Sequence, residues 1–191
     1  DYEFLSKLDR IIMVSESNLR NLVRLFPQWK MKTAVVENIL PEEMILEKAA
    51  EKVQFTKEAD ALYLVTVCRI DYSHKGLDRV IRVFSKIKNE KWFSDVRWVI
   101  IGDGKDMAQL KLDIGKNGLE RNVILLGEQT NPYPYVRMMD AFLLPSRYEG
   151  KPMVVEEALL LGLPCLVTAY GSAHEQIHEN GLIWENRSEE H

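Results

Sequence analysis

PSRYEGKPMVVEEALLLGLP, residues 145–164, begins where a short apolar run at residues 141–144 ends. A short apolar run that is broken by proline and glycine predicts a buried parallel strand followed by a polar loop. Pro152 suits the first position of a helix, where its missing N–H costs nothing, and Gly162 supplies a stop. The stretch therefore predicts a strand, a loop and a helix in direct succession.

Two acidic side chains, Glu149 and Glu157, lie eight positions apart in this stretch. Glu149 falls in the loop, and Glu157 falls about one and a half turns into the helix on the 3.6-residue period. Both can face the crevice at the carboxyl end of a parallel sheet, where open α/β folds bind their ligands. Glu156 is turned about 100° around the helix from Glu157 and is expected to point elsewhere.

The rest of the chain alternates between apolar runs and amphipathic segments, with short connections between them. This alternation predicts an α/β fold of the Rossmann-like type, with a parallel sheet and helices on both faces. We expect strands at residues 61–67, 96–101, 123–126, 141–144, 165–167 and, at the edge of the sheet, 181–184. We expect the other helices at residues 41–54, 77–89 and 106–116, with short ones near Pro134 and at residues 173–178.

The first forty residues carry a strand–helix–strand pattern of their own. Strands are expected at residues 10–15 and 33–37, and Ser15 or Ser17 can cap the helix between them. If this piece has been cut from a larger sheet, it should expose apolar strand edges. It would then dock on the main domain or pair between chains.

Arg69, Lys75 and Gly76 lie in the loop that follows the predicted central strand 61–67. A phosphate group is strongly anionic, so a site that binds one needs fixed cations or a metal. Arginine presents a fork of donors and lysine a compact charge. The two cations can therefore hold a diphosphate in the same crevice as the two acids.

The pair of acids within EGKPMVVEEA, joined to Arg69, Lys75 and Gly76 in this order, resembles the donor site of the retaining family 4 glycosyltransferases. These are GT-B enzymes with two Rossmann-like domains, and the resemblance covers nearly the whole chain. It implies that residues 41–191 form the nucleotide-sugar-binding domain. Residues 1–40 would be the C-terminal remnant of the acceptor-side domain, so the chain would be the C-terminal half of a GT-B glycosyltransferase.

The resemblance also implies roles for individual residues. Arg69 and Lys75 would clamp the diphosphate and Glu149 would lie beside the transferred sugar, and these three are the expected catalytic residues. Glu157 would accept hydrogen bonds from the ribose hydroxyls. The other expected donor-binding residues supply backbone N–H groups or tight turns, and they are Gly76, Gly102, Gly104, Gly150, Lys151 and Met153.

Four further residues lie near the predicted site. Gly171 and Ser172 can contribute N–H groups near the phosphates, whereas Glu175 is interpreted only as a helix acid. The family commonly has glycine before the arginine, but this chain has Cys68 there, so the backbone is expected to pass the phosphates differently.

The implied reaction moves a hexosyl group from a nucleoside diphosphate sugar to a hydroxyl of a glycan or lipid-linked acceptor. The acceptor would be bound by the missing N-terminal domain, so the chain alone should bind donor weakly and transfer little. No cofactor and no metal are expected, because the chain contains no Asp-x-Asp sequence. We expect a cytoplasmic enzyme that can associate peripherally with the inner face of the cell membrane.

Composition excludes other classes of protein. The net charge of −4, with acids and bases mixed along the chain, argues against nucleic acid as a partner. No apolar run reaches the length of a membrane span. Cys68 and Cys165 fall in apolar strand contexts and are predicted to be free thiols.

Four other interpretations were weighed. Glycoside hydrolysis also uses two carboxylates, but it needs no pair of cations, so we disfavour it. The Gly102-Asp103-Gly104 turn lacks the third glycine of the dinucleotide fingerprint, because Met107 stands there. A nucleotide-sugar epimerase of the same fold and a non-catalytic nucleotide-binding module stay open as alternatives.

Overall fold

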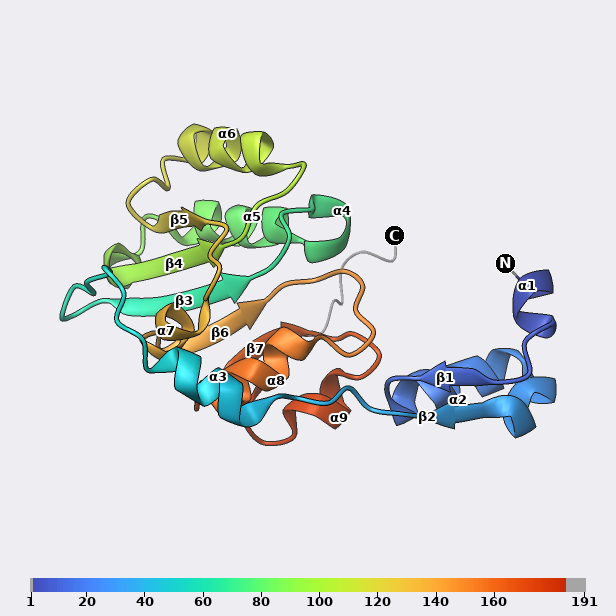
Figure 1. The fold of residues 1–191 in the computed structure, drawn as a ribbon. Helices are drawn as coiled ribbons and strands as arrows, with labels where there is room; N and C mark the ends of the chain where they lie inside the picture. The colour runs from blue at the N-terminus through green and yellow to red at the C-terminus, as the bar shows by residue number, and fades with distance from the viewer. Residues whose placement is uncertain (1, 185–191) are drawn as a thin grey trace.

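The structure is a computed structural model that describes residues 2–184. Its main sheet has six parallel strands in the order β5-β4-β3-β6-β7-β8. Figure 1 shows the strands from β5 to β7 side by side. The strands are β3 (Leu62–Val67), β4 (Val96–Ile101), β5 (Val123–Gly127), β6 (Ala141–Leu144), β7 (Cys165–Thr168) and β8 (Gly181–Trp184). The six predicted strands are all present, and β8 forms an edge as expected.

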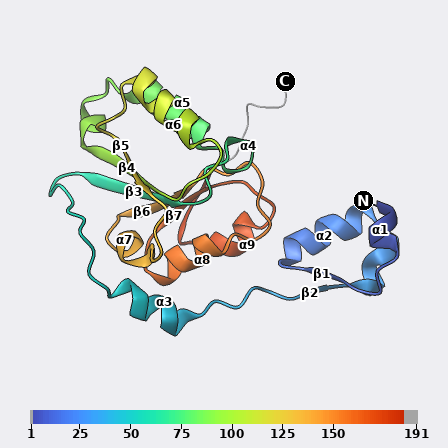
Figure 2. The same ribbon diagram turned by 45° about the horizontal axis from the view of Figure 1, so that its top comes forward.

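Helices cover both faces of this sheet, which confirms the predicted fold class (Figures 1 and 2). One face carries α5 (Leu77–Ile87) and α6 (Met107–Asn117). The opposite face carries α7 (Tyr133–Arg137), α8 (Met153–Leu160) and α9 (Ala173–Ile177), with α3 (Glu42–Ala49) packed against α7.

The two faces bury two apolar clusters, and side chains that alternate along each strand divide between them. In β3 and β4, Val65 and Val99 point into the cluster under α7, α8 and α9. Their neighbours Trp98 and Ile100 point into the cluster under α5 and α6, with Phe84. Because both faces are buried, these strands read as nearly continuous apolar runs rather than as alternating ones.

Several local boundaries differ from the sequence-based expectation. The helix predicted for residues 41–54 ends at Ala49, and Phe55, which follows the predicted helix, packs edge-on against Tyr63 and Tyr135. Pro152 is the N-cap of α8 rather than its first residue. Short helices that were not predicted are α1 (Tyr2–Ser6), η1 (Pro27–Lys32), α4 (Tyr72–Lys75) and η2 (Lys91–Asp95).

The beginning of the chain forms a separate small unit (Figure 1). Its strands β1 (Ile11–Met13) and β2 (Thr33–Val35) pair in parallel, and α2 (Glu16–Leu25) connects them. Apolar side chains of this unit, including Ile12 and Met31, are more than half exposed. Ile12 lies in β1, so this strand exposes an apolar side chain, as expected for a piece of a larger sheet.

Among residues 2–184, no helix has the length and apolar character needed to cross a bilayer.

Gly76 lies where the loop after β3 packs closely against the loop after β6. It has a left-handed conformation with φ of 62°, and a Cβ atom added there would collide with the carbonyl oxygen of Pro145. Gly118 has a similar φ of 65°, but a Cβ added there would meet nothing within 4 Å. Replacing each glycine with alanine therefore measures two effects on stability separately. At Gly118 the left-handed conformation acts alone, and at Gly76 the close approach of Pro145 is added.

We predict that Gly76→Ala destabilises the chain more than Gly118→Ala does. The left-handed conformation alone costs alanine about 1 kcal/mol. The collision with Pro145 should add about 1–3 kcal/mol at Gly76, since a backbone carbonyl must move. Urea denaturation of both variants measures the difference, and equal destabilisation would show that the two loops do not depend on this contact.

Candidate functional site

The loop after β3 carries Lys75 on the single helical turn α4. α4 lies between Asp71 and the left-handed Gly76, whose N–H donates to the Tyr72 carbonyl at 3.2 Å. Asp106 at the start of α6 accepts the Tyr72 N–H at 2.8 Å. The turn is thus fixed at both ends, and it presents Lys75 toward the neighbouring strand β6.

Lys75 forms an ion pair with Glu149, which follows β6. The Lys75 Nζ atom lies 2.6 Å from Glu149 Oε1, and the Ser146 hydroxyl donates to the same oxygen at 2.7 Å. The side chains of Lys75 and Glu149 are 22% and 10% exposed. Two residues that are far apart in sequence therefore meet at the carboxyl ends of two adjacent strands, in a partly desolvated pair.

Arg147 fixes the loop after β6 to the loop after β3. Its guanidinium donates to both carboxylate oxygens of Asp78 at 2.7 Å and to the Tyr72 carbonyl at 2.7 Å. Its own N–H donates to the His74 carbonyl at 2.7 Å. A bidentate pair of this kind is specific in direction, so Arg147 sets how the two loops lie against each other.

Asp71 lies close to two cations and a histidine at the same end of the sheet. Its Oδ2 atom lies 3.9 Å from Arg69, 3.2 Å from Lys105 and 3.2 Å from the ring of His74. Hydrogen bonds from Ser73, Lys105 and His74 lower the pKa of the Asp71 carboxyl below its ordinary range, although desolvation opposes them. Arg69, whose side chain is 72% exposed, can leave this carboxylate for another anion.

Gly102 and Gly104 bring the loop after β4 against the loop after β3. A Cβ atom added at either glycine would collide with a carbonyl oxygen, that of Cys68 for Gly102 and that of Ile70 for Gly104. The Ile70 N–H donates to the Asp103 carbonyl at 2.9 Å across the same contact. Both glycines therefore let two backbones approach each other at the site.

Glu157 lies in the second turn of α8, as its spacing predicts. The Tyr133 hydroxyl at the start of α7 donates to Glu157 Oε1 at 3.5 Å, a long hydrogen bond. Desolvation raises the pKa of the Glu157 carboxyl above its ordinary value of 4.5, although the bond from Tyr133 opposes the shift. Glu149 and Glu157 thus have different partners, a cation for one and a phenol for the other.

Backbone donors are available between these two acids. Within residues 2–184, no hydrogen bond from the N–H groups of Gly150, Lys151 or Met153 is found. They stand at the N-terminus of α8, where N–H groups lack partners inside the helix and the dipole favours anions and hydroxyl oxygens. The predicted donors are therefore free to bind a ligand.

An open cavity of about 470 Å³ lies at the carboxyl ends of β3, β4 and β5. Arg69, Gly102, Glu128 and Gln129 line it, and Val154 closes it from α8. Cys68 also lines it, but burial raises the pKa of its thiol to about 12, so it is not a nucleophile at neutral pH. A second cavity, of about 320 Å³, lies beside β7 and β8 and is lined mainly by apolar side chains such as Leu166 and Trp184.

The structure thus brings Lys75 and Glu149 into direct contact and places Arg69 at the cavity beside them. Sequence reasoning missed Arg147, Asp71 and Tyr133. Arg147 lies in the loop after β6 and Tyr133 at the start of α7, and their partners Asp78 and Glu157 are far away in sequence. Asp71 could have been suspected, because it lies between the two cations in the loop.

The comparison with protein families decides the identity of the chain. The family described as "Glycosyl transferases group 1" matches residues 47–191, which is most of the chain. The chain belongs to this family.

Characterised and uncharacterised relatives agree with the assignment of this group 1 domain. It is 29% identical over 168 residues to an uncharacterized glycosyltransferase of Methanocaldococcus jannaschii, covering 86% of this chain and 41% of that protein. It is 29% identical over 182 residues to the N-acetylgalactosamine-N,N'-diacetylbacillosaminyl-diphospho-undecaprenol 4-alpha-N-acetylgalactosaminyltransferase of Campylobacter jejuni, covering 94% and 47%. The group 1 domain therefore spans less than half the length of these two relatives.

Solved structures share its fold. The TM-score is 0.72 against WaaG, a glycosyltransferase involved in lipopolysaccharide biosynthesis, with 20% identity over 93% of this chain and 50% of that one. A structure of a Staphylococcus aureus TarM mutant in complex with UDP gives a TM-score of 0.75, with 20% identity over 96% of this chain and 35% of that one. Both likenesses confirm the fold of one half of a GT-B glycosyltransferase.

Within the described part of this group 1 domain, no group of three or more His, Cys, Asp or Glu side chains is placed to hold a metal ion.

We predict that Asp78→Asn destabilises the group 1 domain by about 1–3 kcal/mol at pH 7, because it leaves the partly buried Arg147 without its carboxylate. Desolvation acts to raise the pKa of Asp78, but Arg147 outweighs it and holds the pKa below 3.8. Because the pKa of Asp78 is lower in the folded chain than in the unfolded chain, its carboxylate stabilises the fold at every pH above the unfolded-state pKa. This stabilisation is lost as the pH falls through the folded-state pKa. The difference between wild type and variant should therefore be constant from pH 7 to 5 and shrink below about pH 4.

Urea denaturation between pH 3 and pH 7 measures this difference. The matched control is Glu3→Gln, since Glu3 pairs with Lys7 where both side chains are more than 70% exposed. The control should change stability by less than about 0.5 kcal/mol at every pH. A loss for Asp78→Asn as small as that of the control would contradict the role given to Arg147.

Proposed function

We propose that residues 41–191 are the donor domain of a retaining glycosyltransferase, which moves a hexosyl group from a nucleoside diphosphate sugar to a hydroxyl of a glycan or lipid-linked acceptor. The observation that carries the proposal is the 2.6 Å contact between Lys75 and Glu149 at the carboxyl end of the sheet. It supplies a cation for the leaving group and an acid beside it, in one place. Residues 1–40 then belong to the acceptor-side domain, which binds the second substrate.

In this proposal the two cations stabilise the departing diphosphate. Lys75 exchanges Glu149 for a phosphate oxygen, and Arg69 exchanges Asp71 for another. Each cation faces a carboxylate in the unliganded chain. Lys75, whose side chain is 22% exposed, is therefore already partly desolvated and oriented before the sugar nucleotide arrives. No metal is required for this charge stabilisation, because fixed cations supply it.

The remaining contacts position the sugar and the nucleoside. The free N–H groups of Gly150, Lys151 and Met153 bind sugar hydroxyls, and Glu157 accepts hydrogen bonds from the ribose. The turns at Gly76, Gly102 and Gly104 hold the phosphate-binding loops together, and Glu128 and Gln129 face the base. Catalysis is then mainly positioning and charge stabilisation, with the leaving diphosphate helping to deprotonate the acceptor hydroxyl.

Relatives support this choice of substrates. The Campylobacter jejuni relative is named as a transferase that acts on a diphospho-undecaprenol-linked acceptor. The TarM structure contains UDP. We therefore propose that the enzyme uses a nucleotide-sugar donor and a lipid-linked or glycan acceptor. We further propose that it is cytoplasmic and acts at the membrane surface.

Calorimetric titration of the chain with UDP-, GDP- and ADP-sugars tests the proposal. We predict weak binding of at least one donor, and a loss of about tenfold or more in affinity for Lys75→Gln, because a charge-assisted contact to phosphate is removed. Lys111→Gln is the matched control, since Lys111 is exposed on α6. A folded wild-type chain that binds none of these donors would contradict the proposed function.

Glu157 gives the binding a distinct pH dependence. Its ionised form is the acceptor for the ribose hydroxyls, and its pKa is raised above 4.5 by desolvation. Donor affinity should therefore be highest at neutral pH and decrease as pH falls through the raised pKa. Calorimetry across pH 5–8 measures this, and in Glu157→Gln the affinity should be lower and independent of pH over that range; an unchanged profile in this variant would assign the titration to another group.

A further inference from the structure

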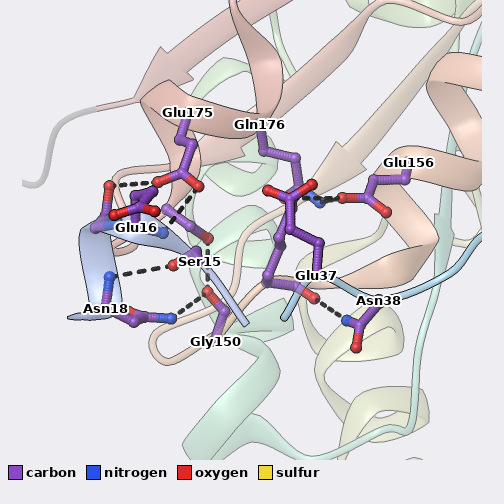
Figure 3. A network of polar contacts seen from close by, with 12 residues as sticks. Ser15, Glu16, Asn18, Glu37, Asn38, Gly150, Glu156, Glu175 and Gln176 are labelled. Atoms are coloured by element: carbon purple, nitrogen blue, oxygen red, sulfur yellow. Dashed lines mark hydrogen bonds and ion pairs between the residues drawn. The ribbon is translucent and has the colours of Figure 1, made fainter. Parts of the chain in front are cut away.

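The small unit at the start of the chain touches the main domain beside the loop after β6, as Figure 3 shows. This loop carries Glu149 and Gly150 and is called the donor loop below. Glu175 of α9 accepts the N–H groups of Glu16 and Ser17 at 3.1 and 2.9 Å, and the Ser17 hydroxyl at 2.8 Å. Glu175 is therefore more than a helix acid, which corrects the interpretation made from sequence. Its carboxylate binds the first turn of a helix that belongs to another unit.

These contacts complete the N-terminus of α2. The first four N–H groups of a helix have no partner within it. Ser15 supplies the partners for Asn18 and Leu19, through its hydroxyl at 3.1 Å and its carbonyl at 3.0 Å. The N–H groups of Glu16 and Ser17 are left for Glu175, whose negative charge also suits the helix dipole.

The same turn of α2 holds the donor loop. The Asn18 side-chain amide donates to the Gly150 carbonyl at 3.0 Å, and the Ser172 hydroxyl donates to the same oxygen at 2.6 Å (Figure 3). Asn18 also packs closely on this region, since its Oδ1 lies 3.0 Å from the position of a Cβ added at Gly171. The carbonyl that follows Glu149 is thus held from both units.

The contacts that hold the Gly150 carbonyl also fix the direction of the Lys151 N–H group. The Gly150 carbonyl and the Lys151 N–H belong to one planar trans peptide, so they point in opposite directions. A carbonyl that points at α2 and α9 therefore turns the Lys151 N–H away from them. The Lys151 side chain, which is 8% exposed, adds a second connection between the units through its 2.9 Å contact with Glu37.

We propose that Glu175 and Asn18 are positioning residues for the sugar of the donor. Glu175 docks α2 on the main domain, and Asn18 of the docked helix orients the Gly150–Lys151 peptide so that the Lys151 N–H faces a sugar hydroxyl. This inference rests on the proposed function for the identity of the ligand. The inference adds that the small unit at the start of the chain completes the donor site, besides belonging to the acceptor-side domain.

The direct test replaces Asn18 with aspartate. Asn18→Asp keeps the size of the side chain and places a favourable acid in the first turn of α2, but it can no longer donate to the Gly150 carbonyl. Asn21→Asp is the matched control, because it adds the same charge one turn along α2 at an exposed position. Both variants should fold.

The readout compares UDP with UDP-glucose, UDP-galactose and UDP-N-acetylglucosamine by calorimetry. In Asn18→Asp, affinity for the best-bound sugar nucleotide should fall about three- to tenfold, the loss expected for one hydrogen bond, while affinity for UDP stays within about twofold. Asn21→Asp should change neither. Equal weakening of UDP and UDP-sugar, or no weakening of either, would overturn the positioning role although the proposed function stands.

Glu175→Gln tests the docking itself without any ligand. A glutamine offers one acceptor oxygen and no charge, so hydrogen exchange of the Glu16 and Ser17 amides should become at least about threefold faster. Unchanged exchange would overturn the docking contact. A folded wild-type chain that binds neither UDP nor any of the three sugar nucleotides would instead contradict the proposed function, and the positioning role with it.

Discussion

The ion pair between Lys75 and Glu149 is the interaction on which the arrangement of the site depends. It joins the loops that leave two adjacent parallel strands, β3 and β6, and it lies where both loops are partly desolvated. The contact requires the left-handed Gly76 next to the Pro145 carbonyl and the bidentate hold of Arg147 on Asp78. A pair of this kind tolerates the exchange of one partner for another anion far better than the loss of a partner, which would leave a charge unpaired.

The same principle applies to the other cation of the site. Arg69 is near Asp71 in the unliganded chain, at 3.9 Å and with most of its side chain exposed. Both cations thus face carboxylates of the protein. Of the two, Lys75 is already largely removed from water before a phosphate takes the place of its carboxylate. Preorganisation of this kind explains how a diphosphate could be held by side chains that come from only one loop.

Sequence patterns predicted the parts of this structure that depend on local chemistry. The apolar runs at residues 61–67 and 96–101 became central strands because they are buried on both faces, and Gly162 follows α8 as a stop. The loops that carry Lys75 and Glu149 were located by the strands before them, since parallel strands all end at one edge. The helical turn of α4 was missed, because its four residues carry no period and the turn is fixed by Asp106 and Arg147.

Contacts between distant segments were beyond sequence reasoning for a physical reason. Glu175 reads as an ordinary acid in a short helix, and only the docking of α2 gives its carboxylate three donors. Phe55 likewise reads as an ordinary apolar residue after a helix, and in the structure two aromatic rings from elsewhere in the chain pack against it. In both cases the contact comes from tertiary packing, which local patterns do not specify.

One measurement tests the central claim most directly, a crystal structure of the chain with UDP. The account predicts the diphosphate within hydrogen-bonding distance of Lys75 and Arg69, beside the N-terminus of α8, with the contact between Lys75 and Glu149 lengthened or exchanged. The uridine should occupy the cavity that Gly102 and Gln129 line. UDP bound instead over the apolar cavity at Leu166 and Trp184, with the ion pair unchanged, would contradict it.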